Sequence, residues 1–139
     1  MAKEKVKINW IENMAFTAEV NGHEVILDAS EKVGGEDRGP RPKSLMLAAL
    51  AGCTGMDVVS ILKKMRVEFE DFQVIVEGGL TEEHPKQFEE MHVIYALKGK
   101  NLPLEKIQKA VNLSEERYCG VSATYKKAFK ITSEIRINE

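Results

Sequence analysis

Cysteine, histidine and tryptophan are scarce in this chain. Its 139 residues include two cysteines, three histidines and one tryptophan. No C-x-x-C pair occurs, and no histidine lies at ligand spacing from a cysteine, which argues against a zinc site. The G-x-G-x-x-G, Walker and G-x-S-x-G patterns are also absent, so dinucleotide, nucleotide and serine-hydrolase sites lack support. We therefore expect no metal and no cofactor.

The chain also lacks an excess of one charge and a long apolar run. Its formal net charge of −2 gives no reason to expect nucleic acid or an anionic membrane as a partner. The segment Met1–Lys7 has no apolar stretch of the secretory kind. The longest apolar run, Leu45–Gly52, is too short to cross a bilayer. We expect a cytoplasmic protein, without a membrane partner, whose two cysteines stay mostly reduced.

Length and composition indicate one globular domain. Hydrophobic residues make up 43% of the chain and charged residues 30%, a balance outside the range of disordered proteins. A chain of this length can build a proper core. No repeat, linker or low-complexity tract divides the sequence. We expect residues 1–139 to form a single domain.

Alternating apolar residues predict six strands, and Asn21-Gly22 predicts a tight hairpin between the second and third. Gly78-Gly79 is expected to end the fourth strand. The strands are centred on Val6–Trp10, Phe16–Val20, His23–Leu27, Phe72–Val76, Met91–Leu97 and Ile131–Ile137.

Three segments are expected to be helical, and a surface loop over Ala29–Pro42 precedes the first of them. The first helix runs from about Lys43 to Met65. A second carries the apolar stripe of Leu104, Ile107 and Val111, with Asn101 as its cap. Ser114 is expected to cap a third, short helix.

The resulting order is β-β-β-α-β-β-α-α-β, an α+β fold with antiparallel sheets around a long central helix. That helix is apolar around much of its circumference and about 34 Å long. Six strands of one chain cover it only partly, so a second subunit is needed to complete its burial. We therefore expect a homodimer.

The two cysteines are candidates for a dithiol redox site. Cys53 lies within the apolar central helix, and Cys119 follows 66 positions later. Simple packing of both thiols is the alternative reading, because free cysteine often behaves as a small buried hydrophobe. A reactive Cys53 needs a nearby cation, since the thiolate is the nucleophile. The nearest in sequence are Arg38, Arg41 and Lys43.

None of these cations reaches Cys53 along its own helix. Lys43 lies ten helical positions away, roughly 15 Å along the axis. The activating group must therefore come from a loop folded back, from another strand, or from a partner subunit.

Two sequence blocks resemble the OsmC/Ohr family of organic-hydroperoxide-handling proteins, most closely its OsmC-like branch. The first is Pro42–Cys53, followed by Met56–Leu62, and the second is Leu113–Ser122 around the other cysteine. The similarity extends over nearly the whole chain, including the strand order and the places of both cysteines.

The resemblance implies an intertwined homodimer with two active sites at the subunit interface. It implies that Cys53 is the peroxidatic nucleophile and Cys119 the resolving thiol. A small organic hydroperoxide would be the substrate, and an external dithiol of the lipoyl type would restore both thiols. No metal, haem or flavin is implied.

One departure from the family pattern leaves an alternative open. The peroxidases of the family carry a glutamate ten positions before the first cysteine, where this chain has Lys43. The family's activating arginine has no secure counterpart, since Met14 lies near one expected place. The alternative is a binding protein of the same fold, without efficient peroxidase activity, that holds an apolar or thioester ligand at the dimer interface. A dimer with inert thiols is a third reading.

Overall fold

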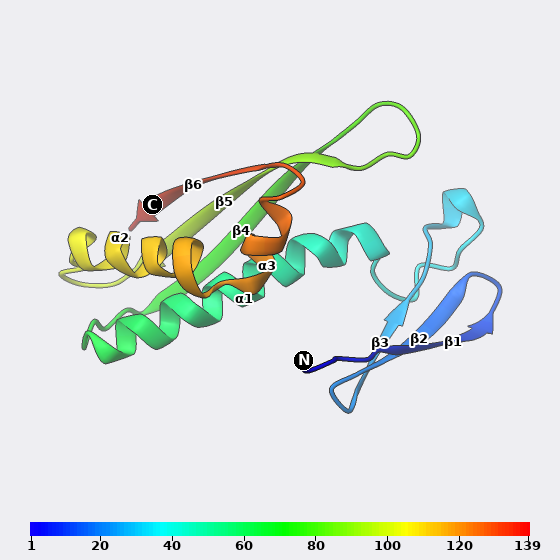
Figure 1. The fold of residues 1–139 in the computed structure, drawn as a ribbon, viewed down its shortest axis with the longest axis horizontal. Helices are drawn as coiled ribbons and strands as arrows, with labels where there is room; N and C mark the ends of the chain where they lie inside the picture. Colours follow the sequence, from blue (N-terminus) through cyan, green and yellow to red (C-terminus); the bar gives the residue numbers. More distant parts are fainter. The chain divides into compact units, whose positions relative to one another are not determined.

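The computed structural model describes all 139 residues, which form two compact units, Met1–Met46 and Leu47–Glu139. The element order confirms the expected α+β arrangement. It runs β1 (Lys7–Glu12), β2 (Ala15–Val20), β3 (His23–Leu27), the 3₁₀ turn η1 (Glu31–Val33), α1 (Pro42–Lys64), β4 (Asp71–Leu80), β5 (Phe88–Lys98), α2 (Leu104–Leu113), the π-helical turn η2 (Ser114–Tyr118), α3 (Gly120–Tyr125) and β6 (Lys130–Ile137) (Figure 1).

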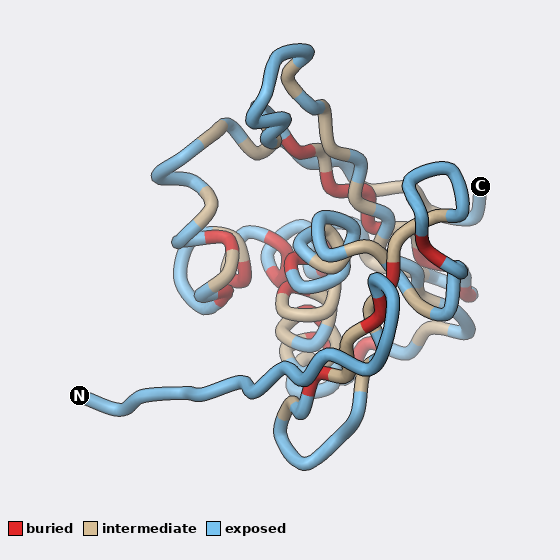
Figure 2. The backbone as a smooth tube through the Cα atoms, turned by 90° about the vertical axis from the view of Figure 1, so that its right-hand side faces the viewer, coloured by how far each residue is buried: buried red, intermediate tan, exposed pale blue.

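The first unit is an antiparallel sheet in the order β1-β2-β3. The predicted hairpin is confirmed: Asn21 and Gly22 both have positive φ, at 51° and 80°, as a tight two-residue turn requires. The expected half-burial of β1 is wrong for the single chain. Every residue of β1 is exposed (Figure 2). Trp10 keeps 64% of its surface. This sheet has little core of its own.

The loop after β3 is held by the Asp28 carboxylate. It accepts backbone N–H bonds from Ala29, Glu36 and Arg38, at 2.7, 3.2 and 3.1 Å. Burial opposes ionisation of Asp28, but these N–H groups outweigh it, so the pKa of this carboxyl lies below its usual value. The stabilisation of the loop by this charge is therefore present at neutral pH and is lost as the pH falls through the lowered pKa.

Helix α1 begins and ends within one residue of its predicted limits. Its buried residues are Leu50, Thr54, Val58 and Leu62, which recur every four positions and form one narrow stripe. The whole helix is long and apolar enough to cross a bilayer, unlike the short run considered in the sequence. The buried stripe nevertheless packs into the core of the second unit, so α1 is a core helix.

The second unit places α1 and α2 against one face of the sheet β4-β5-β6 (Figure 1). Buried residues of β5 fill the space between sheet and helices, namely Met91, Val93, Tyr95 and Leu97. β4 and β5 are antiparallel, as expected, whereas β6 runs parallel to β5. The parallel pairing follows from the connection, because α2, η2 and α3 carry the chain back before β6 begins.

Gly78 lies inside β4, where the sequence led us to expect the end of the strand. It pairs with Met91, and the β4–β5 ladder continues for two residues beyond it, to Leu80. A Cβ atom at Gly78 would lie 2.6 Å from Phe88 Cε1 and 2.9 Å from Leu47 Cδ2. Glycine here permits close side-chain packing and does not mark a turn.

Both expected caps of the later helices are wrong. Asn101 has a positive φ of 55°, and α2 takes Pro103 as its N-cap. Ser114 is helical, so the chain continues without a break from α2 into η2. The residue that caps the next helix, α3, is Cys119.

Candidate functional site

The fold brings the two cysteines together. Cys53 lies in the middle of α1 and Cys119 directly before α3. Their sulfur atoms and a carboxylate oxygen of Asp57 all lie within 4.8 Å of one another. Cys119 is buried, Cys53 is half-buried, and neither forms a disulfide. We call these three residues the thiol–carboxylate cluster.

Local structure fixes each member of this cluster. Cys53 and Asp57 are four residues apart on α1, so they share one side of that helix. Cys119 has an extended backbone, and its Sγ accepts the N–H of Ser122 at 3.3 Å. Its own N–H donates to the Ser114 carbonyl at 2.8 Å. The second sulfur is therefore held as the N-cap of α3.

The surroundings of Cys119 favour its protonated form. Burial raises the pKa of this thiol to about 11, and the hydrogen bond with Cys53 and the negative charge of Asp57 act in the same direction. The N–H of Ser122 offsets only part of that effect. Cys119 is therefore a thiol, and not a thiolate, near neutral pH.

Two of the three candidate activating cations form ion pairs within the first unit, and the third is exposed to solvent. The Arg38 guanidinium pairs with Glu12, Glu36 and Asp28. Arg41 Nη1 lies 2.5 Å from a carboxylate oxygen of Asp37. Lys43 is exposed and forms no ion pair.

The cluster in the second unit has no ion-paired cation of its own. No lysine, arginine or histidine nitrogen lies within 4.0 Å of the Asp57 carboxylate. The structure thus joins the two predicted thiols and adds an acidic partner, where the sequence led us to look for a basic one.

A chain of hydroxyl groups leads away from Asp57. Ser114 Oγ donates to Asp57 Oδ2 at 2.9 Å and contacts Thr54 Oγ1 at 2.8 Å. Thr54 Oγ1 lies 2.8 Å from the Tyr95 hydroxyl, which donates to Glu115 Oε2 at 2.9 Å. Three hydroxyl hydrogens serve four contacts. Ser114 and Tyr95 donate to carboxylates, so the one Thr54 hydrogen serves only one of its two contacts.

This polar chain was not predicted, although the sequence carries one signal for it. Asp57 is the only charged residue between Leu45 and Leu62, and Thr54 lies beside it on the same helix. Polar side chains on an apolar core helix require hydrogen-bond partners when they are buried. The partners come from β5 and η2, and the sequence alone does not place either element beside α1.

Replacing Thr54 by valine is expected to lower the free energy of unfolding by about 1–2 kcal/mol. Thr54 is 1% exposed and contacts both Tyr95 and Ser114. Valine keeps the shape of threonine, so the loss reports the polar contacts of the hydroxyl group and not a cavity. Urea unfolding would measure it, with Thr124→Val as the matched control because the Thr124 hydroxyl is exposed. Equal stability of the two variants would contradict a structural role for the chain.

Asp57 also borders a surface hollow of about 460 Å³. The other residues that line it come from α1, α2 and η2, namely Ser60, Ile61, Lys64, Leu113 and Tyr118. This hollow gives the carboxylate of the cluster a connection to solvent.

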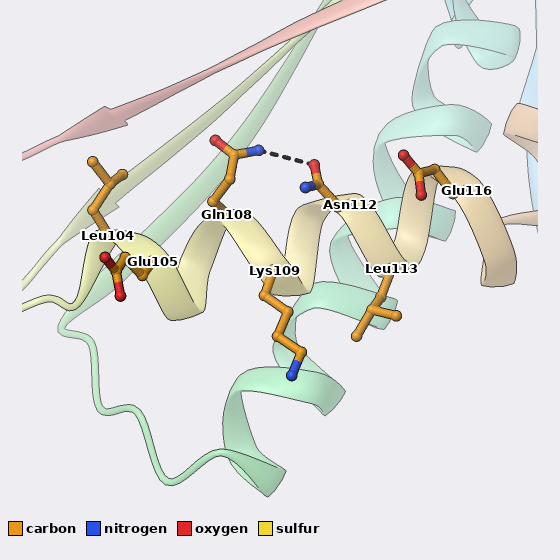
Figure 3. Close-up of a pocket in the computed structure, with 7 residues that line it drawn as sticks. All are labelled: Leu104, Glu105, Gln108, Lys109, Asn112, Leu113 and Glu116. Carbon is orange, nitrogen blue, oxygen red and sulfur yellow. Dashed lines mark hydrogen bonds between the residues drawn. The ribbon is translucent and has the colours of Figure 1, made fainter.

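A separate hollow of about 490 Å³ lies on the outer side of α2 and η2 (Figure 3). Its lining residues include Glu105, Lys109 and Glu116, and Gln108 Nε2 donates to Asn112 Oδ1, one turn further along α2, at 2.9 Å. Neither cysteine lines it, so it is not part of the candidate site.

Comparison with known proteins agrees with the sequence resemblance. Residues 34–134 match the family described as OsmC-like protein. Protein YhfA of Escherichia coli strain K12 is 31% identical over 134 residues, which cover 96% of this chain and 97% of that protein. The crystal structure of a hypothetical protein from Aquifex aeolicus VF5 matches with a TM-score of 0.83 and 32% identity, over the full length of both chains.

A more distant solved structure is that of a protein named for organic hydroperoxide resistance. The organic hydroperoxide resistance protein OhrB of Bacillus subtilis matches with a TM-score of 0.64 and 21% identity, over 95% of this chain and 96% of that one. At this identity the likeness concerns the fold alone. The family match and the relatives above 30% identity together decide the assignment: this chain belongs to the OsmC-like family.

Proposed function

We propose that the protein reduces organic hydroperoxides by a two-cysteine cycle. The observation that carries the proposal is the pair of free sulfur atoms within 4.8 Å of each other, in a member of the OsmC-like family. Free thiols at this distance can condense to a disulfide after one is oxidised.

In the first step the Cys53 thiolate attacks the distal oxygen of the hydroperoxide. The O–O bond breaks, the sulfur is oxidised to sulfenic acid, and the alkoxide takes up a proton and leaves as an alcohol. Cys53 is the better first nucleophile, because Cys119 has a pKa raised to about 11 and is almost wholly protonated near neutral pH.

In the second step the Cys119 sulfur attacks the sulfenic sulfur and displaces water, which leaves a Cys53–Cys119 disulfide. An external dithiol, of the lipoyl type, then reduces the disulfide by thiol–disulfide exchange and is itself oxidised to a disulfide. One hydroperoxide and one dithiol are consumed in each cycle, and no metal or organic cofactor takes part.

Thiol counting tests this proposal directly. Fully reduced protein, kept in excess chelator, is mixed with cumene hydroperoxide, and free thiols are counted under denaturing conditions. We expect two thiols lost per chain, one alcohol formed, and a mass decrease equal to two hydrogens. Protein alkylated at both cysteines beforehand is the control. Unchanged thiols after many equivalents of peroxide would refute the proposal.

We further propose that residues 1–139 act as one domain in an intertwined homodimer in the cytoplasm, with the candidate site at the subunit interface. The support is the unusual amount of apolar surface that the single chain leaves exposed. It includes Val6, Ile8, Trp10, Ile11, Met14, Ile26 and Val33 of the first unit, and Met46 and Met56 of α1. Patches of this kind mark protein interfaces.

The apolar surface of α1 also borders a hollow of about 550 Å³. Its lining combines the glycines of the helix with apolar side chains of α1 and β4, namely Gly52, Gly55, Met56, Val59, Phe72 and Val74, with Ser60 and Lys63 at its polar side. We expect a second copy of this chain to cover this face of α1.

The second candidate function is a binding protein of the same fold without efficient peroxidase activity. The observation in its favour is the acidic Asp57 beside the two thiols, with no ion-paired cation to stabilise a thiolate. An apolar or thioester ligand would then occupy the dimer interface. Native mass spectrometry of purified protein distinguishes the two functions. A binding protein is expected to retain a small molecule, and its thiols are expected not to react with hydroperoxide.

A further inference from the structure

We propose that the reduced thiol–carboxylate cluster, Cys53, Asp57 and Cys119, is a binding site for a soft or borderline divalent metal ion such as Zn²⁺. This inference is independent of the peroxide reaction. No metal was expected from the sequence, because no histidine lies at ligand spacing from either cysteine. The structure supplies a carboxylate as the third donor, one helical turn after Cys53.

The donor atoms already lie close to the geometry of a metal site. Tetrahedral zinc with Zn–S bonds of about 2.3 Å places its ligand atoms about 3.5–3.8 Å apart. The three donors here lie within 4.8 Å of one another, so no pair has to close by more than about 1.3 Å. Two thiolates and one carboxylate are donors that zinc accepts, and the thiolates exclude magnesium and calcium as preferred ions.

The charges of the cluster favour a cation. The Asp57 carboxylate is half-buried and has no ion-pair partner within 4.0 Å. A divalent ion would bind this carboxylate and the two sulfur atoms together and would balance their negative charge.

The surroundings hold the carboxylate in place for this role. Ser114 Oγ donates to Asp57 Oδ2, and Thr54 contacts Ser114 in turn, so the side chain of Asp57 has a fixed direction. Hydrogen bonds that orient a metal ligand in this way raise metal affinity. The N–H of Ser122 fixes Cys119 Sγ in the same manner.

Three protein donors leave one tetrahedral position open. Asp57 borders the solvent-connected hollow beside Ser60, Lys64 and Tyr118, which offers an entry path for the ion and space for a water ligand. Such a site combines three protein ligands with one position for an exchangeable water.

Binding and oxidation are mutually exclusive in this site. Zn²⁺ binds both sulfur atoms as thiolates, so two Zn–S bonds form and each thiol proton still present is released to solvent. Once Cys53 and Cys119 form a disulfide, neither sulfur is a thiolate and only the carboxylate remains. The site is therefore expected to hold metal in the reduced protein and to release it on oxidation.

A cobalt titration tests this inference without any peroxide. Full-length reduced protein, freed of metal by a chelator and then freed of the chelator, is titrated with Co²⁺ under argon. We expect one Co²⁺ per chain, with a sulfur-to-cobalt charge-transfer band, and displacement of Co²⁺ by Zn²⁺. Protein oxidised with diamide is expected to show no such band, and this comparison needs no substitution.

Substitution of each proposed ligand tests whether that residue binds the metal. Cys53→Ser and Cys119→Ser are expected to lose the charge-transfer band, and Asp57→Asn to weaken Co²⁺ binding at least tenfold. Asp71→Asn removes an exposed carboxylate of β4 and is the matched control, with unchanged binding. Circular dichroism checks that each variant is folded.

Unchanged affinity in folded Asp57→Asn, or equal binding by reduced and oxidised protein, would overturn the metal site. Because this experiment contains no peroxide and thiol counting contains excess chelator, failure of one proposal leaves the other standing.

Discussion

Cys53→Ser protein is expected to consume organic hydroperoxide at least roughly 10³-fold more slowly than the wild type, since removal of a catalytic nucleophile has effects of this size or larger. Serine cannot form a sulfenic acid, and Cys119 remains a buried thiol, whose pKa is raised by that burial. The measurement is the rate of hydroperoxide loss with dihydrolipoamide as reductant.

Cys119→Ser is the matched variant for this experiment. It keeps Cys53, so one equivalent of hydroperoxide per chain is expected to react and leave a sulfenic acid that dimedone traps. Turnover with the external dithiol then slows, because no internal thiol forms the disulfide. If Cys53→Ser retained turnover while Cys119→Ser lost it, the two cysteines would have the opposite roles.

Met56→Asp is expected to dissociate the proposed homodimer. Met56 keeps 76% of its surface in the single chain and borders the apolar hollow along α1. A second copy that covers this face would bury an unpaired carboxylate, which weakens association by roughly 100-fold or more. Light scattering after size-exclusion chromatography measures the result: wild type at twice 15.6 kDa, and the variant at the mass of one chain.

Leu104→Asp provides the control for this substitution. Leu104 is 55% exposed on α2 and does not line the α1 hollow. The same change from an apolar to an acidic residue is therefore expected to leave the dimer intact. A wild-type protein that elutes as a single chain would refute the dimer itself, and a Met56→Asp dimer would place the interface on another face.

The sequence predicted well those elements whose signal is local. The limits of α1 were predicted within one residue because its apolar residues form an uninterrupted helical pattern. The hairpin at Asn21-Gly22 was predicted because those residues tolerate positive φ. The errors at Gly78, Asn101 and Ser114 share one cause. Each residue was taken as a boundary from its type alone, whereas β4 continues past Gly78, α2 takes Pro103 as its N-cap, and Ser114 is helical.

The site was predicted only in part for the same reason. The family resemblance pointed to Cys53 and Cys119, and their sulfur atoms do lie together. Asp57 was missed because its partners, Ser114 and Cys119, are 57 and 62 residues away along the chain. Its role depends on how the connection from β5 to β6 packs against α1, which no local pattern encodes.

Because Cys119 is the N-cap of α3, we expect the stability of the first turn of this helix to depend on the oxidation state of the protein. The sulfur that accepts the Ser122 amide hydrogen is the atom that a disulfide would engage. Rotation of that sulfur toward Cys53 frees the amide, and the first turn of α3 loosens. Faster deuterium uptake over Gly120–Tyr125 would then distinguish oxidised from reduced molecules inside a mixed population, without any label on the sulfur itself.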